Sequence, residues 1–193
     1  MQFFYKKEQK GRYNVYIPLF LLSAVNLTLY GIRLSLWGAV WMAAYAFVEE
    51  ALYRGFLLSA LTRRYEERLL RGIMFSSILF ALMHTVNVYK VATPLYVTAQ
   101  SLCAGTVGFC LGIVACRERS IVLCVLLHAC VNITSLGAGE PGTFGRMPGK
   151  MDVTSREAAV FIASAVLYAL YGIWLYRRGI LLKKEEKNYE ALH

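Results

Sequence analysis

Six apolar stretches fill most of this chain, and short clusters of Lys and Arg separate them. Of the 193 residues, 58% are hydrophobic, above the roughly 45–50% that is usual in soluble domains. A segment of this length and polarity crosses a bilayer as a helix, because only a helix satisfies its own backbone amides there. The stretches are approximately 13–32, 34–62, 72–89, 91–116, 120–137 and 157–176. The sequence therefore predicts an all-α polytopic membrane protein, a bundle of about six transmembrane helices, with residues 1–193 forming a single membrane domain.

The positive charges are unevenly divided between the two ends of these stretches. Four Lys or Arg precede the first stretch, four separate the second from the third, two separate the fourth from the fifth, and five follow the sixth. The connections at the other end carry five in all. Cytoplasmic connections of membrane proteins are enriched in Lys and Arg, so this split of 15 to 5 predicts that both termini are cytoplasmic. Because the chain is compact and carries no eukaryotic retention signal, we expect a multi-pass protein of a bacterial plasma membrane.

Neither the net charge nor the cysteines indicate another class of protein. The basic residues behind the net charge of +9 flank the apolar stretches, so membrane topology explains them and no nucleic-acid partner is expected. The five cysteines lie in or at the ends of two apolar stretches and form no metal-type Cys-x-x-Cys pair. We interpret them as small packing residues.

Two adjacent glutamates lie inside the second stretch, where a charge at bilayer depth costs about 2.5–3.5 kcal/mol. Glu50 and Arg54 are four residues apart, so on a helix they share a face and can neutralise each other. Glu49 lies about 100° around the helix from Glu50 and has no partner at helical spacing. An unpaired carboxyl in a dry, helical site is a candidate general base or metal ligand.

Two histidines and an asparagine also lie within apolar stretches. His84 belongs to the third stretch, and His128 belongs to the fifth with Asn132 four residues further along the same helical face. Three polar residues lie 13 positions from the arginine at the basic end of their stretch: Glu50 from Arg63, His84 from Arg71, and Asn132 from Arg119. At 1.5 Å per residue, that separation is a common depth of about 20 Å. We therefore expect one shared polar site inside the bundle.

Such a set of groups suits the hydrolysis of a peptide bond. A carboxylate beside a histidine can hold a water molecule and take its proton. A second histidine and an amide N–H can stabilise the oxyanion that forms. Two histidines and a glutamate could instead bind zinc and leave a position open for water, although the sequence contains no HExxH signature.

Three motifs on separate apolar stretches resemble those of a known family. They are Glu49-Glu50-x-x-x-Arg54, Phe80-x-x-x-His84 and His128-x-x-x-Asn132, in that order. Together they look like the CAAX-protease and bacteriocin-processing family of intramembrane proteases, called CPBP or Abi. The resemblance covers about residues 49–132, and it implies a catalytic core at about 34–137.

The resemblance implies a role for each motif residue. Glu49 would activate water with the help of His84, and His128 and Asn132 would form the oxyanion pocket. Three further residues would support the site by pairing and packing: Glu50, Arg54 and Phe80. The substrate would be a peptide or protein at the membrane, such as a prenylated C-terminus, a bacteriocin leader or a single-span protein.

The resemblance leaves the metal dependence of such a site open. We favour a site without a cofactor, because asparagine is a poor zinc ligand. The alternative is zinc or another divalent metal held by His84, His128 and Glu49.

Two other functions fit the same buried groups. One is a non-catalytic scaffold on the same fold, serving bacteriocin immunity or regulation, although the intact set of motifs argues against it. The other is a small proton-coupled carrier. A carrier would normally show inverted repeats or broken helices, and the sequence shows neither.

Overall fold

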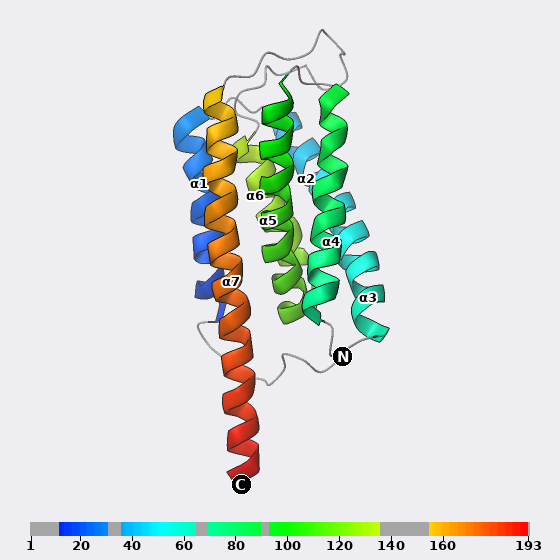
Figure 1. Ribbon diagram of the computed structural model, residues 1–193, viewed down its shortest axis with the longest axis vertical. Coiled ribbons are helices and arrows are strands. Elements are labelled where there is room, and N and C mark those ends of the chain that lie inside the picture. The colour runs from blue at the N-terminus through cyan, green and yellow to red at the C-terminus, as the bar shows by residue number, and fades with distance from the viewer. Residues whose placement is uncertain (1–11, 31–35, 65–68, 90–92, 136–154, 193) are drawn as a thin grey trace.

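All regular structure in the described part of the chain is helical. The computed structural model describes residues 12–30, 36–64, 69–89, 93–135 and 155–192. These residues form six rods, and consecutive rods run in opposite directions (Figure 1). The rods are η1 (Arg12–Tyr16) with α1 (Ile17–Tyr30); α2 (Leu36–Glu50) with η2 (Ala51–Leu58) and α3 (Ser59–Arg64); α4 (Leu69–His84) with η4 (Thr85–Tyr89); α5 (Pro94–Glu118); α6 (Val122–Ser135); and α7 (Ser155–Leu192).

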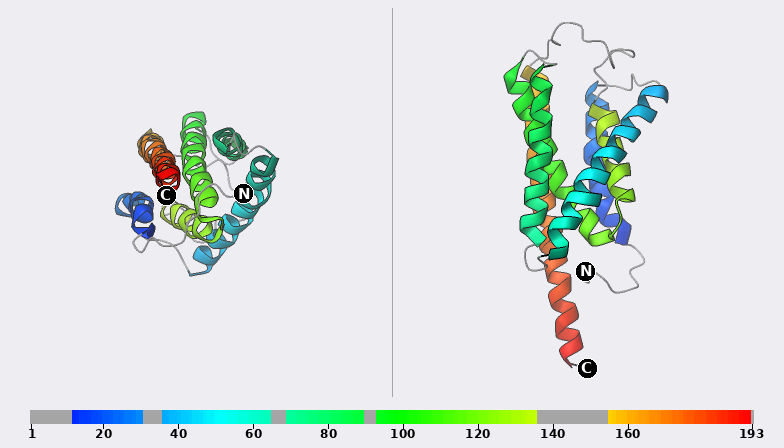
Figure 2. Two further views of the ribbon diagram at one scale, coloured as in Figure 1. Left: turned by 90° about the horizontal axis from the view of Figure 1, so that it is seen from below. Right: turned by 90° about the vertical axis from the view of Figure 1, so that its right-hand side faces the viewer.

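The rods are arranged in two layers of three. One layer holds α7, α5 and α4, and the other holds α1, α6 and α2 (Figure 2). The second rod is oblique: α2 packs on α6, and as the rod continues through η2 into α3 it reaches α4. It therefore connects the two layers at the end where α4 begins.

Close packing around α5 holds the layers together. Its buried side chains, among them Val107, Leu111 and Val114, form one apolar core with residues of α1, α4, α6 and α7. The approach of α4 is tight enough that a Cβ added at Gly112 would lie 2.9 Å from Ile73 Cγ2. Small residues permit such close contact between membrane helices.

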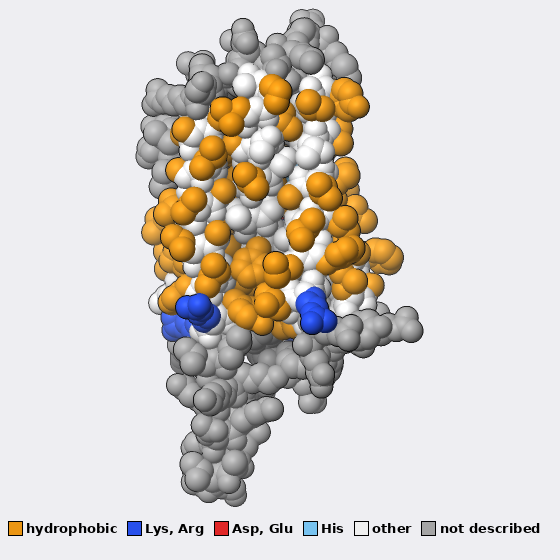
Figure 3. Space-filling model, viewed as in Figure 1, with side chains coloured by type: hydrophobic (Ala, Val, Ile, Leu, Met, Phe, Trp, Pro, Cys, Tyr) orange, Lys and Arg blue, Asp and Glu red, His pale blue; other side chains and the backbone are white. Residues whose placement is uncertain are grey.

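The outer surface of the bundle is apolar over most of its length and basic at one end (Figure 3). Four exposed arginines mark that end, here called the basic belt: Arg71, Arg119, Arg177 and Arg178. Three described segments are long and apolar enough to cross a membrane: Leu69–Tyr89, Pro94–Glu118 and Ala158–Gly179. The expected all-α polytopic membrane fold is confirmed, and the count of six spans stays a prediction.

The structure differs from the expected helices in two places. The second rod is not one α-helix, because its middle, Ala51–Leu58, is π-helical. The last helix continues to Leu192, past the expected end at 176, since its Lys and Glu residues favour helix in water as well. The sequence at 138–156 is rich in Gly and Pro and predicts a loop between the fifth and sixth apolar stretches. It lies outside the described residues except for its last two positions, which belong to α7.

Antiparallel rods place the start of α1 at the end of the bundle that carries the basic belt, and α7 extends past the belt on the same side (Figure 1). If the belt is cytoplasmic, green fluorescent protein fused after residue 193 should fluoresce and alkaline phosphatase fused there should be inactive. At residue 150 the phosphatase should be active and the fluorescent protein dark. Activity of alkaline phosphatase and green fluorescent protein fusions measures both positions. The same side for both insertions would contradict the predicted topology.

Candidate active site

The π-helical turn after Glu50 is stabilised by hydroxyl groups. Ser76 of α4 donates through Oγ to the Tyr53 carbonyl at 3.1 Å, and Ser59 donates to the Arg54 carbonyl at 3.2 Å. A π-helical segment loosens the backbone hydrogen bonds of the helix, so extra donors for its carbonyl groups stabilise it. π-helical turns often occur at functional sites, and this one follows the two glutamates directly.

Glu50 is the buried centre of the site. Its carboxylate is fully inaccessible, and Arg54 Nη1 donates to Oε1 at 2.5 Å. His128 of α6 lies on the same oxygen, with Nδ1 at 2.8 Å. A carboxylate accepts hydrogen bonds, so in this contact Nδ1 carries the proton. The pair expected within the second stretch therefore has a third member from another helix.

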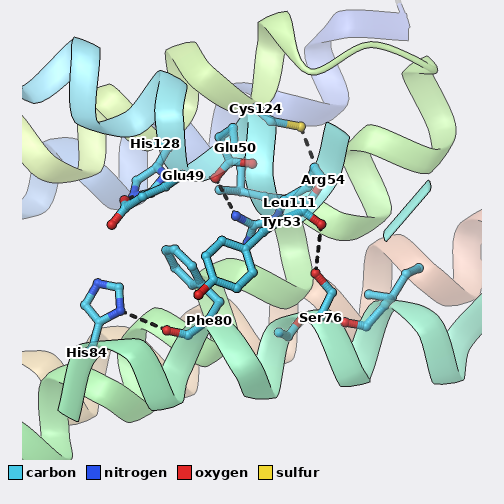
Figure 4. Close-up of polar contacts among 12 residues, drawn as sticks. Glu49, Glu50, Tyr53, Arg54, Ser76, Phe80, His84, Leu111, Cys124 and His128 are labelled. Atoms are coloured by element: carbon cyan, nitrogen blue, oxygen red, sulfur yellow. Dashed lines mark hydrogen bonds and ion pairs between the residues drawn. The ribbon is translucent and has the colours of Figure 1, made fainter. Parts of the chain in front are cut away.

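Phe80 fills the space beneath this group (Figure 4). The Arg54 guanidinium carbon lies 4.6 Å from the centre of its ring, a cation–π contact. The edges of Tyr53, His84 and His128 surround the same ring at centroid distances of 5.1, 4.8 and 5.4 Å. Within the described residues Arg54 Nε and Nη2 have no hydrogen-bond acceptor, so the ring face is what offsets their burial.

Glu49 has a different environment from Glu50. Its side chain is 35% exposed, and Oε2 lies 3.4 Å from His128 Nε2. His128 thus faces one glutamate with each ring nitrogen. Helical spacing alone did not reveal this partner of Glu49, because it belongs to α6, 79 positions further along the chain. Of the two glutamates, only Glu49 can meet a water molecule or a substrate.

His84 is fixed in one tautomer when neutral. Its Nδ1 lies 2.9 Å from the Phe80 carbonyl oxygen, and a carbonyl can only accept, so Nδ1 carries the hydrogen. Nε2 then holds a lone pair. The ring and the Glu49 carboxylate face the same space from α4 and α2 (Figure 4), so a proton acceptor stands on either side of it.

One cavity of about 290 Å³ joins the four residues expected to be catalytic. Its wall includes Glu49, His84, His128 and Asn132, which come from three different rods. The common depth estimated from the sequence agrees with this arrangement. The catalytic roles of the four residues stay predictions.

Two amide side chains of the cavity wall were missed from the sequence. Asn87 of η4 and Gln100 of α5 line the wall, and Asn87 Nδ2 donates to Gln100 Oε1 at 2.9 Å. A signal existed for one of them, since Asn87 follows His84 by three residues and shares its helical face. The signal for Gln100 was weaker: a lone amide in an apolar stretch.

The described residues contain no group of three or more His, Cys, Asp or Glu arranged to hold a metal ion. Both ring nitrogens of His128 face carboxylates, and Nδ1 of His84 is bound to a carbonyl group. Zinc ligation by His84, His128 and Glu49 would use Nε2 of each histidine, because Nδ1 of each is already engaged by an oxygen atom. It remains the alternative to a site without a cofactor.

The described helices enclose a cavity lined by a glutamate, two histidines and an asparagine inside an apolar bundle. Residues 31–134 match the family model described as type II CAAX prenyl endopeptidase Rce1-like. The match covers more than half of the chain, so the chain belongs to this family of membrane proteases, in keeping with the CPBP resemblance. No curated protein and no solved structure matches the chain significantly.

The Glu50–Arg54 pair should contribute more to folding than Glu49 does. Arg54→Ala should lower the folded yield in detergent, because breaking a buried ion pair typically costs about 3–5 kcal/mol. Glu49→Gln should keep the wild-type yield, since Glu49 is partly exposed. Size-exclusion profiles and thermal melting of the purified variants measure this. Full yield for both would contradict a structural role for the Glu50–Arg54 pair.

Gly108 should be intolerant of any side chain. An added Cβ would lie 3.1 Å from Arg54 Nη2 and 3.3 Å from Phe80 Cδ1, and overpacking costs about 1–3 kcal/mol. Gly55 is the matched control, because its added Cβ would meet nothing closer than 3.8 Å. Gly108→Val should melt at a clearly lower temperature than Gly55→Val. Equal melting temperatures would show that a side chain at position 108 fits between Arg54 and Phe80 without strain.

Proposed function

We propose that this protein is an intramembrane endopeptidase of the CAAX-protease type, in which Glu49 activates water. One observation carries the proposal: Glu49 reaches the cavity with 35% of its side chain exposed, while its neighbour Glu50 is buried by Arg54 and His128. Arg54 and His128 neutralise Glu50, so the carboxylate of Glu49 is the one available to react. The family relationship supports the reaction class.

Glu49 and His84 would move the protons. A water molecule between them donates a proton to the Glu49 carboxylate as its oxygen attacks the carbonyl carbon of the substrate. His84 holds the same water through the lone pair on Nε2. The proton then passes to the amide nitrogen as the C–N bond breaks. Water is thereby divided between the new carboxyl group and the new amine.

Asn132 and His128 would stabilise the oxyanion. The Asn132 amide is a donor in any protonation state. His128 can donate from Nε2 only when both ring nitrogens are protonated, because Nδ1 already gives its hydrogen to Glu50. In that form the two glutamates, Arg54 and His128 together carry no net charge, which suits a site away from water.

The apolar surface supports a substrate that is itself at the membrane. A lipidated C-terminus, a bacteriocin leader and a single-span protein all present a peptide bond there. No cofactor takes part in the proposed steps.

Substitutions at the cavity wall test this mechanism. Glu49→Gln should abolish turnover, because an amide cannot accept the proton from water. Asn132→Ala should leave a slow enzyme, since one oxyanion donor is worth about 10²–10³ in turnover. Both rates are measured on purified protein against internally quenched peptides that represent the three substrate types. A folded Glu49→Gln variant with wild-type turnover would end the glutamate mechanism.

The same assay separates the metal-free mechanism from a zinc site. Strong chelation should leave turnover almost unchanged. Full inhibition that only zinc reverses would instead make His84, His128 and Glu49 ligands. Thr98→Ala, exposed on the outside of α5, is the control and should retain full activity.

A further inference from the structure

The cavity occupies only one half of the bundle. On α2, α4, α5 and α6, its wall begins at the level of the site and continues away from the basic belt. The residues on that side of the site are Met42 and Tyr45 on α2, Asn87 on η4, Tyr96 and Gln100 on α5, and Phe161 on α7. These residues lie near the end where α2, α5 and α7 begin and η4 ends.

The other half of the bundle is solid. Phe80, 1% exposed, forms the floor of the cavity, and the Glu50–Arg54 pair packs against it outside the cavity wall. Below them, Leu58, Ile73 and Cys124 are each at most 2% exposed and belong to the main apolar core. Among the described residues, none of this lower half lines the cavity. A peptide could reach Glu49 from the basic belt only by separating packed helices.

The two halves differ in charge as well as in packing. The basic belt closes the solid half, at the start of α4 and the end of α5. By the enrichment of Lys and Arg in cytoplasmic connections, this end faces the cytoplasm. The hollow half therefore extends toward the extracytoplasmic side.

Two amide side chains of the cavity wall, Asn87 and Gln100, are suited to a peptide backbone. In the hydrogen bond between them, Asn87 uses its amide nitrogen and Gln100 its carbonyl oxygen. Among the described residues neither makes another hydrogen bond, so one acceptor and one donor remain for the cavity. This holds for either orientation of the two amides, because exchanging N and O in both swaps their roles. One acceptor and one donor match the N–H and C=O of an extended peptide.

We propose that the site takes peptide segments from the extracytoplasmic side, with the Asn87–Gln100 pair binding the substrate backbone. The substrate class is then an exported peptide or the extracytoplasmic flank of a membrane protein, and not a cytoplasmic lipidated tail. This substrate class rests on the proposed endopeptidase function. The direction of the cavity does not.

Cysteine labelling of whole cells tests the direction without any substrate. Asn87→Cys and Gln100→Cys mark the two walls of the cavity. Tyr89→Cys, at a position 78% exposed, marks the hollow end. Ser120→Cys, at an exposed position between α5 and α6, marks the basic end. A membrane-impermeant maleimide is applied to intact and to permeabilised cells, and labelling is compared with the wild-type chain and its five native cysteines.

In intact cells, the variants at 87, 89 and 100 should label several-fold above wild type, and Ser120→Cys should label only after permeabilisation. The reverse pattern would overturn the proposal and favour a cytoplasmic substrate. Labelling at 89 with none at 87 or 100 would also overturn it, because the cavity would then be closed at the hollow end.

Membrane vesicles of defined orientation test the substrate class. An impermeant, internally quenched peptide should be cleaved by right-side-out vesicles and not by inside-out vesicles, with Glu49→Gln vesicles as the blank. Cleavage only by inside-out vesicles would overturn the proposal. Expected labelling with no cleavage in either orientation would contradict the endopeptidase function while supporting the direction of the cavity.

Discussion

The buried carboxylate of Glu50 is the interaction on which the site depends. A charge removed from water is strongly unfavourable unless it is paired and hydrogen-bonded. Arg54 supplies one partner from the same rod, and His128 supplies the other from α6. Both partners bond to Oε1, so this one oxygen fixes how α2 faces α6. It also fixes the ring of His128, whose second nitrogen then meets Glu49.

Phe80 extends this arrangement to the second layer of helices. Its ring contacts Arg54 and His128. It also contacts the ring of His84, which lies four residues further along α4. Gly108 of α5 leaves room for the guanidinium and the ring together. The aromatic ring forms a floor with the charged pair packed against it, and apolar packing below makes that half of the bundle solid. The cavity that joins Glu49, His84, His128 and Asn132 lies above this floor.

Several features could be read from the sequence because they depend on distances along single helices. The Glu50–Arg54 pair follows from spacing of four residues, and the common depth of Glu50, His84 and Asn132 follows from a constant rise per residue. The contact between Glu49 and His128 could not be read in this way, since it depends on how two helices rotate about their own axes. The π-helical turn was also hidden, because the Ser76 hydroxyl that supports it comes from another rod.

The sequence by itself determined an all-α membrane bundle, its basic end and the residues that carry charge within it. Its motifs indicated the family, because residue types, their spacing and their order can be read without knowing how the helices pack. Only the tertiary structure decided which glutamate is accessible, which nitrogen of each histidine is engaged, and that the cavity points away from the basic belt. These outcomes depend on the mutual rotation and approach of helices, which the side chains of several rods set together through Phe80, Gly108 and the core around α5.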